Sequence, residues 1–166
     1  MTVTERARIF ATAAHAAVGQ RRKYTMEPYI VHPAEVVSIV ETVPHTAEML
    51  AAAWLHDVVE DTDVTLETIQ KEFGDEVANM VEWLTDVSRP EHGNRAVRKA
   101  IDRAHIAAAP ADAQTIKLAD LISNTKTIVD HDPKFAAIYL DEKSLLLEVL
   151  TKGDSNLLNR ARNQLT

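Results

Sequence analysis

Residues 51–65 have the sequence AAAWLHDVVEDTDVT, in which an apolar run ends abruptly in four ionisable side chains: His56, Asp57, Glu60 and Asp61. On a helix at 100° per residue, these four side chains fall in one arc of about 140°. The C-terminus of a helix is the negative end of its dipole, so each carboxylate there is disfavoured by roughly 0.3–1 kcal/mol. The stretch predicts a buried helix whose acidic end needs a cation.

The ordinary explanation is a helix that has reached solvent, with Asp61 and Asp63 starting a turn before Thr65 caps the next helix. Two features argue against it: residues 51–70 contain no lysine or arginine, and the His-Asp pair follows a stretch expected to be mostly buried. A divalent cation explains both features, because imidazole and carboxylate together suit manganese, iron or zinc. The chain has no cysteine, so any metal must bind to nitrogen and oxygen.

The remaining sequence favours an all-α fold. The chain has only four glycines and no alternating β-branched stretch bounded by turn residues. Helical periodicity predicts a single-domain bundle of about eight to nine helices over residues 1–166, with helices at 4–19, 33–41, 46–59, 65–73, 74–87, 94–108, 111–129, 133–150 and in the last ten residues. The irregular stretch at 19–33 is expected to carry binding groups.

Composition limits the partners. With 18 Lys and Arg against 25 Asp and Glu, the formal net charge of -7 argues against nucleic-acid binding, although a single pocket for a phosphate-bearing small ligand can still be basic. The apolar runs fall short of the roughly 20 residues that a membrane helix needs, and the N-terminus lacks the apolar region of a signal peptide. We therefore expect a soluble cytoplasmic protein without a membrane partner. The sequence leaves a homodimer open.

Remote residues are needed to complete a coordination sphere. His32 precedes Pro33 at a helix start, and Asp120 lies on a long amphipathic helix. A lone histidine of this kind is more often structural than ligating, and a single aspartate on such a helix is usually a solvated charge. Asp120, Asn124 and Thr127 share a helix face at i, i+4 and i+7, which is also the pattern of an ordinary polar face. His15 is expected either to pack in the core or to support the site.

A histidine, an adjacent His-Asp pair on a helix and a remote aspartate follow the order H…HD…D of the HD-domain metal-dependent phosphohydrolases. The chain resembles that superfamily. The segments RRK…EPYIVHPAEV, AAAWLHDVVEDT, VTLETIQKEFGDEVANMVEWLTDVS and IKLADLISNTKT are similar to the hydrolase domain of the RelA/SpoT alarmone enzymes over most of residues 14–130. The chain has no room for the synthetase or regulatory domains of the long forms, so it resembles the small, free-standing alarmone hydrolases.

The resemblance implies one metal ion, typically manganese, and a role for each matching residue. The implied metal ligands are His32, His56, Asp57 and Asp120. Glu60 and Asp61 match the acidic pair that orients or activates the attacking water and assists the leaving group. The implied substrate contacts are Arg22 and Lys23 at the purine base and phosphate, Asn124 and Thr127 at base and ribose, Arg95 or Lys99 at the pyrophosphate, and Tyr139.

The implied reaction is hydrolysis of the 3′-pyrophosphate of guanosine tetra- or pentaphosphate (ppGpp or pppGpp), which yields GDP or GTP and pyrophosphate. The sequence departs from the family pattern in two places: LADLISNTKT replaces the usual LADRLHNMRT, so that Leu121 follows the metal aspartate, and RKYTMEPY replaces RKSGEPY. Other substrates therefore stay open, namely an adenine alarmone, NADPH or another phosphoester. A non-catalytic module that senses nucleotides is a further alternative.

Overall fold

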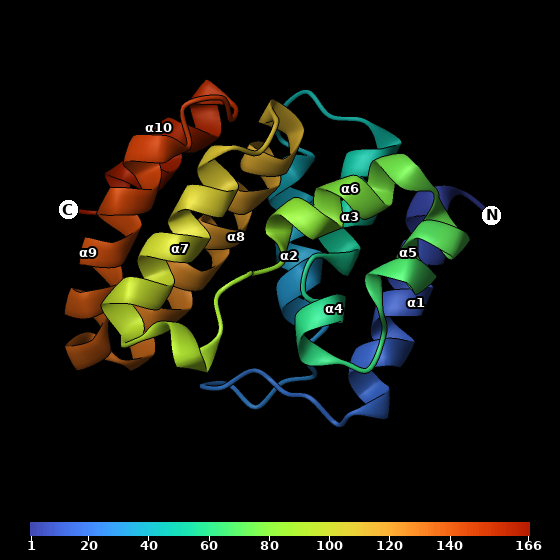
Figure 1. Cartoon of the computed structure of the whole chain (residues 1–166), viewed down its shortest axis with the longest axis horizontal. Coiled ribbons are helices and arrows are strands. Elements are labelled where there is room, and N and C mark those ends of the chain that lie inside the picture. The colour runs from blue at the N-terminus through green and yellow to red at the C-terminus, as the bar shows by residue number, and fades with distance from the viewer. The chain divides into compact units, whose positions relative to one another are not determined.

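The computed structural model describes residues 1–166 and consists of α-helices, one 3-10 turn and no strand (Figure 1). The prediction of an all-α protein is confirmed. The elements are α1 Val3–Ala17, α2 Val31–Val40, α3 Ala47–Leu55, α4 Val58–Asp61, α5 Leu66–Phe73, α6 Asp75–Leu84, η1 Pro90–His92, α7 Arg95–Ala107, α8 Ala111–His131, α9 Pro133–Val149 and α10 Ser155–Asn163. None of these helices is both long and apolar enough to cross a membrane.

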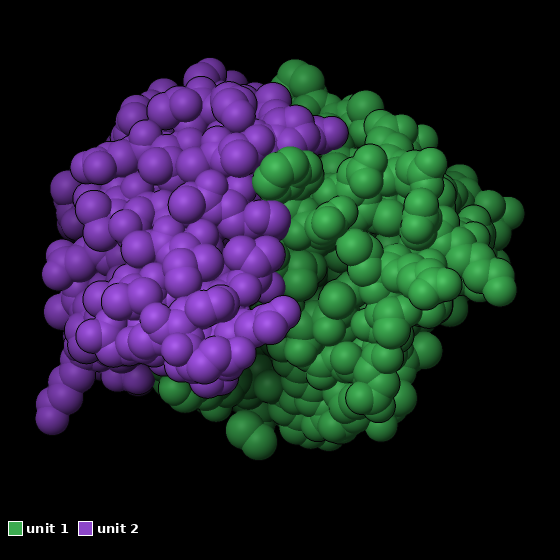
Figure 2. Space-filling model, in the orientation of Figure 1, with its two compact units in different colours: residues 1–85 green, residues 86–166 purple.

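The chain divides into two compact units, residues 1–85 and 86–166, which Figure 2 colours separately. In unit 1, α3 forms the centre and packs against α1, α2 and α6. Its residues Ala51, Ala52, Ala53 and Leu55 are completely buried, as the apolar run predicts. Three consecutive alanines let neighbouring helices approach α3 from several sides, because a methyl side chain fills little space.

The structure divides the predicted helix at 46–59 into α3 and α4, with His56 and Asp57 between them. Asp57 has φ −104° and ψ −2°, in the bridge region between helical and extended backbone. The four-residue helix α4 then carries Glu60 and Asp61. The acidic residues are thus presented by a turn and a short helix instead of by one continuous helix.

The loop between α1 and α2 is ordered by its backbone. Gly19 adopts φ +66°, which glycine reaches without the steric cost of a side chain. An isolated antiparallel bridge joins Arg21 to Pro28. Met26, exposed in this loop, has φ +60°, a left-handed conformation that disfavours side chains other than glycine, asparagine and aspartate. The loop therefore has a defined turn at the position where the sequence departs from RKSGEPY.

In unit 2, α8 is the central helix. It packs against α9 and α10, and α7 packs against α9. The buried side of α8 extends from Ala113 to Thr125 and includes several polar side chains that have partners within the unit. Gly153 lies against α8 so closely that an added Cβ would come within 2.6 Å of Leu118 Cδ1. The turn before α10 is therefore fitted to the surface of α8.

Helix starts follow local sequence signals closely. Thr46 caps α3 through the Met49 N–H, Thr65 caps α5 through the Thr68 N–H, and Asn94 caps α7 through the Val97 N–H. These side chains accept hydrogen bonds from N–H groups that have no partner inside the helix. Because such signals are local, the predicted helix boundaries agree with the observed ones to within a few residues.

Candidate active site

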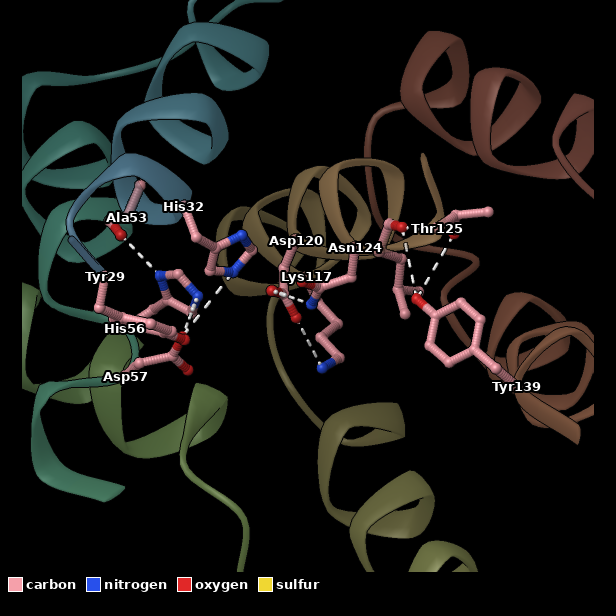
Figure 3. Close-up of polar contacts among 11 residues, drawn as sticks. Tyr29, His32, Ala53, His56, Asp57, Lys117, Asp120, Asn124, Thr125 and Tyr139 are labelled. Atoms are coloured by element: carbon pink, nitrogen blue, oxygen red, sulfur yellow. Dashed lines mark hydrogen bonds and ion pairs between the residues drawn. The ribbon is translucent and has the colours of Figure 1, made fainter. Parts of the chain in front are cut away.

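The turn between α3 and α4 brings His56 and Asp57 beside His32. His32 lies in the first turn of α2, which packs on α3, so all three residues belong to unit 1. Figure 3 shows their side chains converging. The Asp57 Oδ2 atom is 3.0 Å from His56 Nε2 and 3.8 Å from His32 Nε2. Both imidazole rings are buried, and Asp57 is partly exposed.

A backbone carbonyl fixes the orientation of the His56 ring. The Nδ1–H group of His56 donates to the carbonyl oxygen of Ala53 at 2.7 Å. In the neutral ring, the lone pair then lies on Nε2, the atom that faces Asp57. Metal-bound histidines commonly have this arrangement, since a hydrogen bond on one ring nitrogen sets the tautomer in which the other can coordinate.

The donor atoms of this cluster fit a divalent metal ion. One ligand atom each from His32, His56 and Asp57 lies within 4.8 Å of the other two. Around a cation with bonds of about 2.1 Å, neighbouring ligand atoms are separated by about 3.0–3.4 Å and opposite ones by about 4.2 Å. Two imidazole nitrogens and a carboxylate oxygen also form the mixed donor set that suits manganese, iron or zinc. The residues and their spacing are therefore compatible with one bound cation.

Tyr29 connects this cluster to the loop before α2. Its hydroxyl donates a short hydrogen bond to Asp57 Oδ2, the same oxygen that faces the two histidines. The Tyr29 ring also packs between His15 and His32, with ring-centre distances of 4.7 and 5.8 Å. The tyrosine thus holds both the carboxylate and one of the imidazoles.

The two acidic residues with a predicted catalytic role follow on α4. Glu60 and Asp61 are both exposed, and the Asp61 N–H donates to the Asp57 carbonyl at 3.0 Å, so Asp57 starts the turn that carries them. The Asp61 carboxylate accepts a hydrogen bond of 3.1 Å from Gln20 Nε2. Although Asp61 is exposed as a residue, the protein shields part of its carboxyl group from water, and this desolvation raises the pKa of Asp61; the hydrogen bond from Gln20 acts in the opposite direction. The turn and the short helix bring a carboxyl pair to the surface of unit 1.

Arg22 and Lys23, the predicted base and phosphate contacts, lie in the ordered loop of unit 1. The Arg22 N–H donates to the Glu27 carbonyl at 2.8 Å, which closes the turn. The Lys23 ammonium lies 5.3 Å from the centre of the Tyr24 ring, and Lys23 is exposed. The loop therefore presents a cationic side chain to solvent.

In unit 2, α8 carries Asp120, the fourth predicted metal ligand. Its two carboxylate oxygens accept hydrogen bonds of 3.0 Å from Lys117 and from Asn124 (Figure 3). Burial would lower the pKa of Lys117, but the carboxylates of Asp120 and Asp86 raise it above its ordinary value. Lys117 is therefore held as a cation beside the carboxyl group of Asp120. Thr127, about two turns beyond Asp120 on the same helix, donates to the Ser123 carbonyl at 3.5 Å.

The predicted pyrophosphate contacts differ in how they are bonded. Arg95, at the start of α7, forms a bidentate ion pair with Glu142, with distances of 2.7 and 2.9 Å. This hydrogen bonding raises the pKa of Arg95. Lys99 lies one turn further along α7 and is half-buried. Tyr139 packs its hydroxyl against Thr125 on α8, and burial raises the pKa of Tyr139 to about 12.

A family model described as HD domain matches residues 7–141 of the chain. The chain belongs to the HD domain family. The HD domain match includes all the predicted metal, catalytic and substrate residues, and it crosses the boundary between the two compact units at residue 85.

The chain has relatives among bacterial and animal proteins. It is 36% identical over 126 residues to a protein of Aquifex aeolicus named guanosine-3′,5′-bis(diphosphate) 3′-pyrophosphohydrolase; the match covers 75% of this chain and 17% of that protein. It is 38% identical over 117 residues to a Drosophila melanogaster protein of the same name, MESH1, covering 69% of this chain and 64% of MESH1. The chain thus spans about one sixth of the length of the bacterial relative.

A solved structure matches this chain over nearly its whole length. It belongs to a protein described as "A metazoan ortholog of SpoT" that "hydrolyzes ppGpp and plays a role in starvation responses". The TM-score is 0.86 and the identity 28%, and the match covers 99% of this chain and 94% of the other. This chain is therefore similar to that protein in fold and length.

Tyr29 and Gln20 contact predicted site residues of unit 1 but were not themselves predicted. Tyr29 lies three residues before His32, and this spacing at a helix start is the signal that could have identified it. Gln20 is 41 residues from Asp61, its hydrogen-bond partner, and no sequence pattern connects them. The tertiary fold alone brings Gln20 to the acidic pair.

Proposed function

We propose that this protein hydrolyses the 3′-pyrophosphate of ppGpp or pppGpp and releases GDP or GTP and pyrophosphate. The observation that carries the proposal is the similarity over 99% of the chain to a metazoan SpoT ortholog that is described as hydrolysing ppGpp. Relatives at 36% and 38% identity are named for the same reaction. We also propose that the whole chain forms one HD domain, since the family match crosses both units. A homodimer stays a prediction.

We propose that His32, His56, Asp57 and Asp120 hold one divalent metal ion, and that this ion is Mn²⁺. The compact donor set of the first three residues supports the proposal. For Asp120, the support is that its carboxyl group pairs with the Lys117 ammonium at 3.0 Å. When bound, such an ion lowers the pKa of coordinated water and polarises a phosphoryl oxygen. Tyr29 and Ala53 would keep Asp57 and His56 in the orientation that coordination needs.

Glu60 and Asp61 supply the proton transfers in this proposal. Water attacks the phosphorus that is joined to the ribose 3′ oxygen, and the bond between that phosphorus and the 3′ oxygen breaks. A carboxylate of the pair orients the water and takes its proton, and the 3′ oxygen receives a proton as it leaves. The raised pKa of Asp61 suits a group that gains and loses a proton during turnover.

The substrate contacts are proposed residue by residue. Arg22 and Lys23 would pack on the purine and approach phosphate, and Asn124 with Thr127 would contact base and ribose. Lys99 is a better candidate than Arg95 for the pyrophosphate, because the Arg95 guanidinium already binds Glu142 through two hydrogen bonds. Tyr139 would contribute mainly by packing on α8.

The test is a substrate panel with the Mn²⁺-loaded protein, with products separated by chromatography. The panel contains ppGpp, pppGpp, a 3′-pyrophosphorylated adenine nucleotide and NADPH. We expect pyrophosphate and GDP from ppGpp. Inertness toward every 3′-pyrophosphorylated nucleotide would refute the proposal, and turnover of NADPH alone would reassign the substrate.

Variants connect the activity to the site. Asp57→Ala should lose the metal and lower turnover at least about a hundredfold, since both a ligand and its orienting contacts disappear. Glu82→Ala, which removes an exposed carboxylate on α6, is the matched control and should retain both metal and activity. Retained metal and full activity in Asp57→Ala would favour a non-catalytic nucleotide-binding module instead.

A further inference from the structure

Gln20 joins two residues of unit 1 that are far apart in sequence. Its side-chain Oε1 lies 2.8 Å from His15 Nδ1, and its Nε2 donates to Asp61 Oδ2 at 3.1 Å. His15 belongs to α1 and is 1% exposed, whereas Asp61 ends α4 and is exposed. The three residues therefore form a hydrogen-bonded chain from the buried side of α1 to the acidic pair.

The chemistry of the carboxylate fixes the direction of each hydrogen bond. An ionised aspartate only accepts, so the amide group of Gln20 must face Asp61 and its carbonyl must face His15. His15 must then donate from Nδ1, which leaves Nε2 without a proton in the neutral ring. His15 Nε2 is buried and has no hydrogen-bond partner. Burial lowers the pKa of His15, which keeps the ring neutral in this arrangement.

The backbone N–H and carbonyl groups of Gln20 are both hydrogen-bonded. The Gln20 N–H donates to the His15 carbonyl at 3.1 Å, and the Gln20 carbonyl accepts from the Tyr29 N–H at 3.2 Å. Gly19 precedes Gln20 and has a left-handed conformation, which reverses the direction of the chain after α1. Gln20 is therefore fixed on one side to α1 and on the other to the segment that leads to Tyr29 and His32.

In contrast to Gln20, Asp61 lies at an exposed helix end. It is the last residue of a four-residue helix, and its side chain reaches the surface. A carboxylate in such a position can rotate about two side-chain bonds unless a partner restrains it. A general base must keep its oxygen within hydrogen-bond reach of the water it activates, and a misplacement of 1 Å can cost a hundredfold in rate.

We propose that Gln20 is a positioning residue for the proposed hydrolysis: it orients the Asp61 carboxylate toward the water, and His15 fixes Gln20 in the amide orientation that permits this. Gln20 has no role in binding the metal or the nucleotide. This inference rests on the proposed function through the catalytic role of Asp61. It assigns to the loop after α1 a part in the proton transfer.

The central test is Gln20→Leu, which keeps the side-chain volume and removes both hydrogen-bonding groups. With ppGpp and Mn²⁺, we expect kcat to fall about 10-fold to 100-fold, while KM and the metal content stay unchanged. Gln70→Leu is the matched control, because Gln70 also donates from Nε2 to an aspartate of unit 1, Asp75, at 2.7 Å. It should leave kcat unchanged. An equal loss in both variants, or a loss of metal in Gln20→Leu, would overturn the proposal.

Two further variants test how Gln20 acts. In an Asp61→Ala background, Gln20→Leu should cause no additional loss, since its effect passes through Asp61. His15→Phe keeps an aromatic ring against Tyr29 and removes the donor to Gln20, so kcat should fall by a smaller factor, roughly 3-fold to 10-fold. Additive losses in the double variant would mean that Gln20 acts elsewhere.

A spectroscopic measurement separates failure of this inference from failure of the proposed function. The side-chain amide resonances of Gln20 in ¹⁵N-labelled protein should shift in Asp61→Ala and in His15→Phe, whether or not the protein cleaves ppGpp. If they shift but ppGpp is inert, the hydrolase proposal fails and the hydrogen-bonded chain stands without a catalytic role. If Asp61→Ala lowers kcat and Gln20→Leu does not, the positioning role alone is refuted.

Discussion

At the scale of single residues, Asp57 has the most contacts of functional interest. One of its oxygens faces two imidazole nitrogens and also accepts a hydrogen bond from Tyr29. A carboxylate in such surroundings is held in one orientation before any cation binds. The rigid arrangement lowers the entropy lost on coordination, which is the usual contribution of residues that contact metal ligands from outside.

Tyr29→Phe should weaken metal binding about 10-fold while leaving the fold intact. The phenyl ring keeps the packing on His15 and His32, but the Asp57 carboxylate loses its hydroxyl partner. The dissociation constant for Mn²⁺, measured by calorimetric titration of the metal-free protein, reports the change. Tyr24→Phe, in the preceding loop, is the control and should bind Mn²⁺ like the wild type. Equal affinities in wild type and Tyr29→Phe would contradict the proposed role of the hydroxyl.

At the scale of the helices, Gln114 joins several elements of unit 2. Its amide nitrogen donates to carbonyls at the end of α7 and to the Val149 carbonyl at the end of α9. Its side-chain oxygen accepts from the Lys152 N–H at 2.9 Å. Carbonyl groups at a helix C-terminus lack partners within the helix. One fully buried amide thus supplies hydrogen bonds for two helix ends and a turn.

Gln114→Leu should lower the free energy of unfolding by about 2–4 kcal/mol. The substitution keeps the volume but leaves buried backbone groups without partners, each of which costs about 1–3 kcal/mol. Urea denaturation followed by circular dichroism measures the change. The exposed Gln70→Leu, with the same chemical change, should alter stability by less than about 0.5 kcal/mol. Similar values for the two variants would show that the network contributes little.

Lys143 on α9 is a second buried polar group that connects helices. It is completely buried, and its ammonium donates to Thr125 Oγ1 at 2.8 Å and to Gln164 Oε1 at 2.7 Å. Both partners are neutral, so no carboxylate compensates the charge in these contacts. Burial lowers the pKa of Lys143 to about 8. The native state therefore releases this proton at a lower pH than the unfolded chain does.

This shift predicts a pH-dependent stability. Between pH 8 and 10.5 the unfolded state binds more protons at Lys143 than the native state, so stability rises with pH in that window. From pH 7.5 to 9.5 the gain amounts to roughly 1–2 kcal/mol. Urea denaturation of wild type and Lys143→Met at both pH values isolates the contribution, since the variant should lack it. A wild-type stability that falls relative to Lys143→Met as the pH rises would contradict the prediction.

At the scale of the whole molecule, metal binding should be coupled to stability. A ligand that binds only the native state stabilises it by about 2.7 kcal/mol at a concentration of 100 times Kd. For a chain of this size, that corresponds to a rise in Tm of roughly 5–10 °C. Scanning calorimetry with Mn²⁺ and with a chelator should show the difference.

His56→Ala is the variant that tests whether the rise comes from the candidate site. It should remove the Mn²⁺-dependent increase in Tm, while His45→Ala, which alters an exposed histidine before α3, should retain it. A full Mn²⁺ response in His56→Ala would mean that the ion binds at a different place.

Much of the fold follows from local signals in the sequence. The run from Ala51 to Leu55 is buried as its composition indicates, and the helix starts at Thr46, Thr65 and Asn94 coincide with capping residues. The break at Asp57 was not predicted. Periodicity averages over several turns, so it does not detect a single residue with a different backbone conformation.

The sequence by itself determined the helical class and the approximate helix boundaries, because periodicity and capping are local properties. As a set, the candidate ligands His32, His56, Asp57 and Asp120 came from the resemblance to the HD-domain hydrolases and not from a local pattern. Only the tertiary structure decided that His32 lies beside the His-Asp pair and that Gln20 contacts Asp61 across 41 residues. Contacts between distant residues depend on how helices pack, and packing is set by the summed burial of many side chains, which no short stretch of sequence encodes.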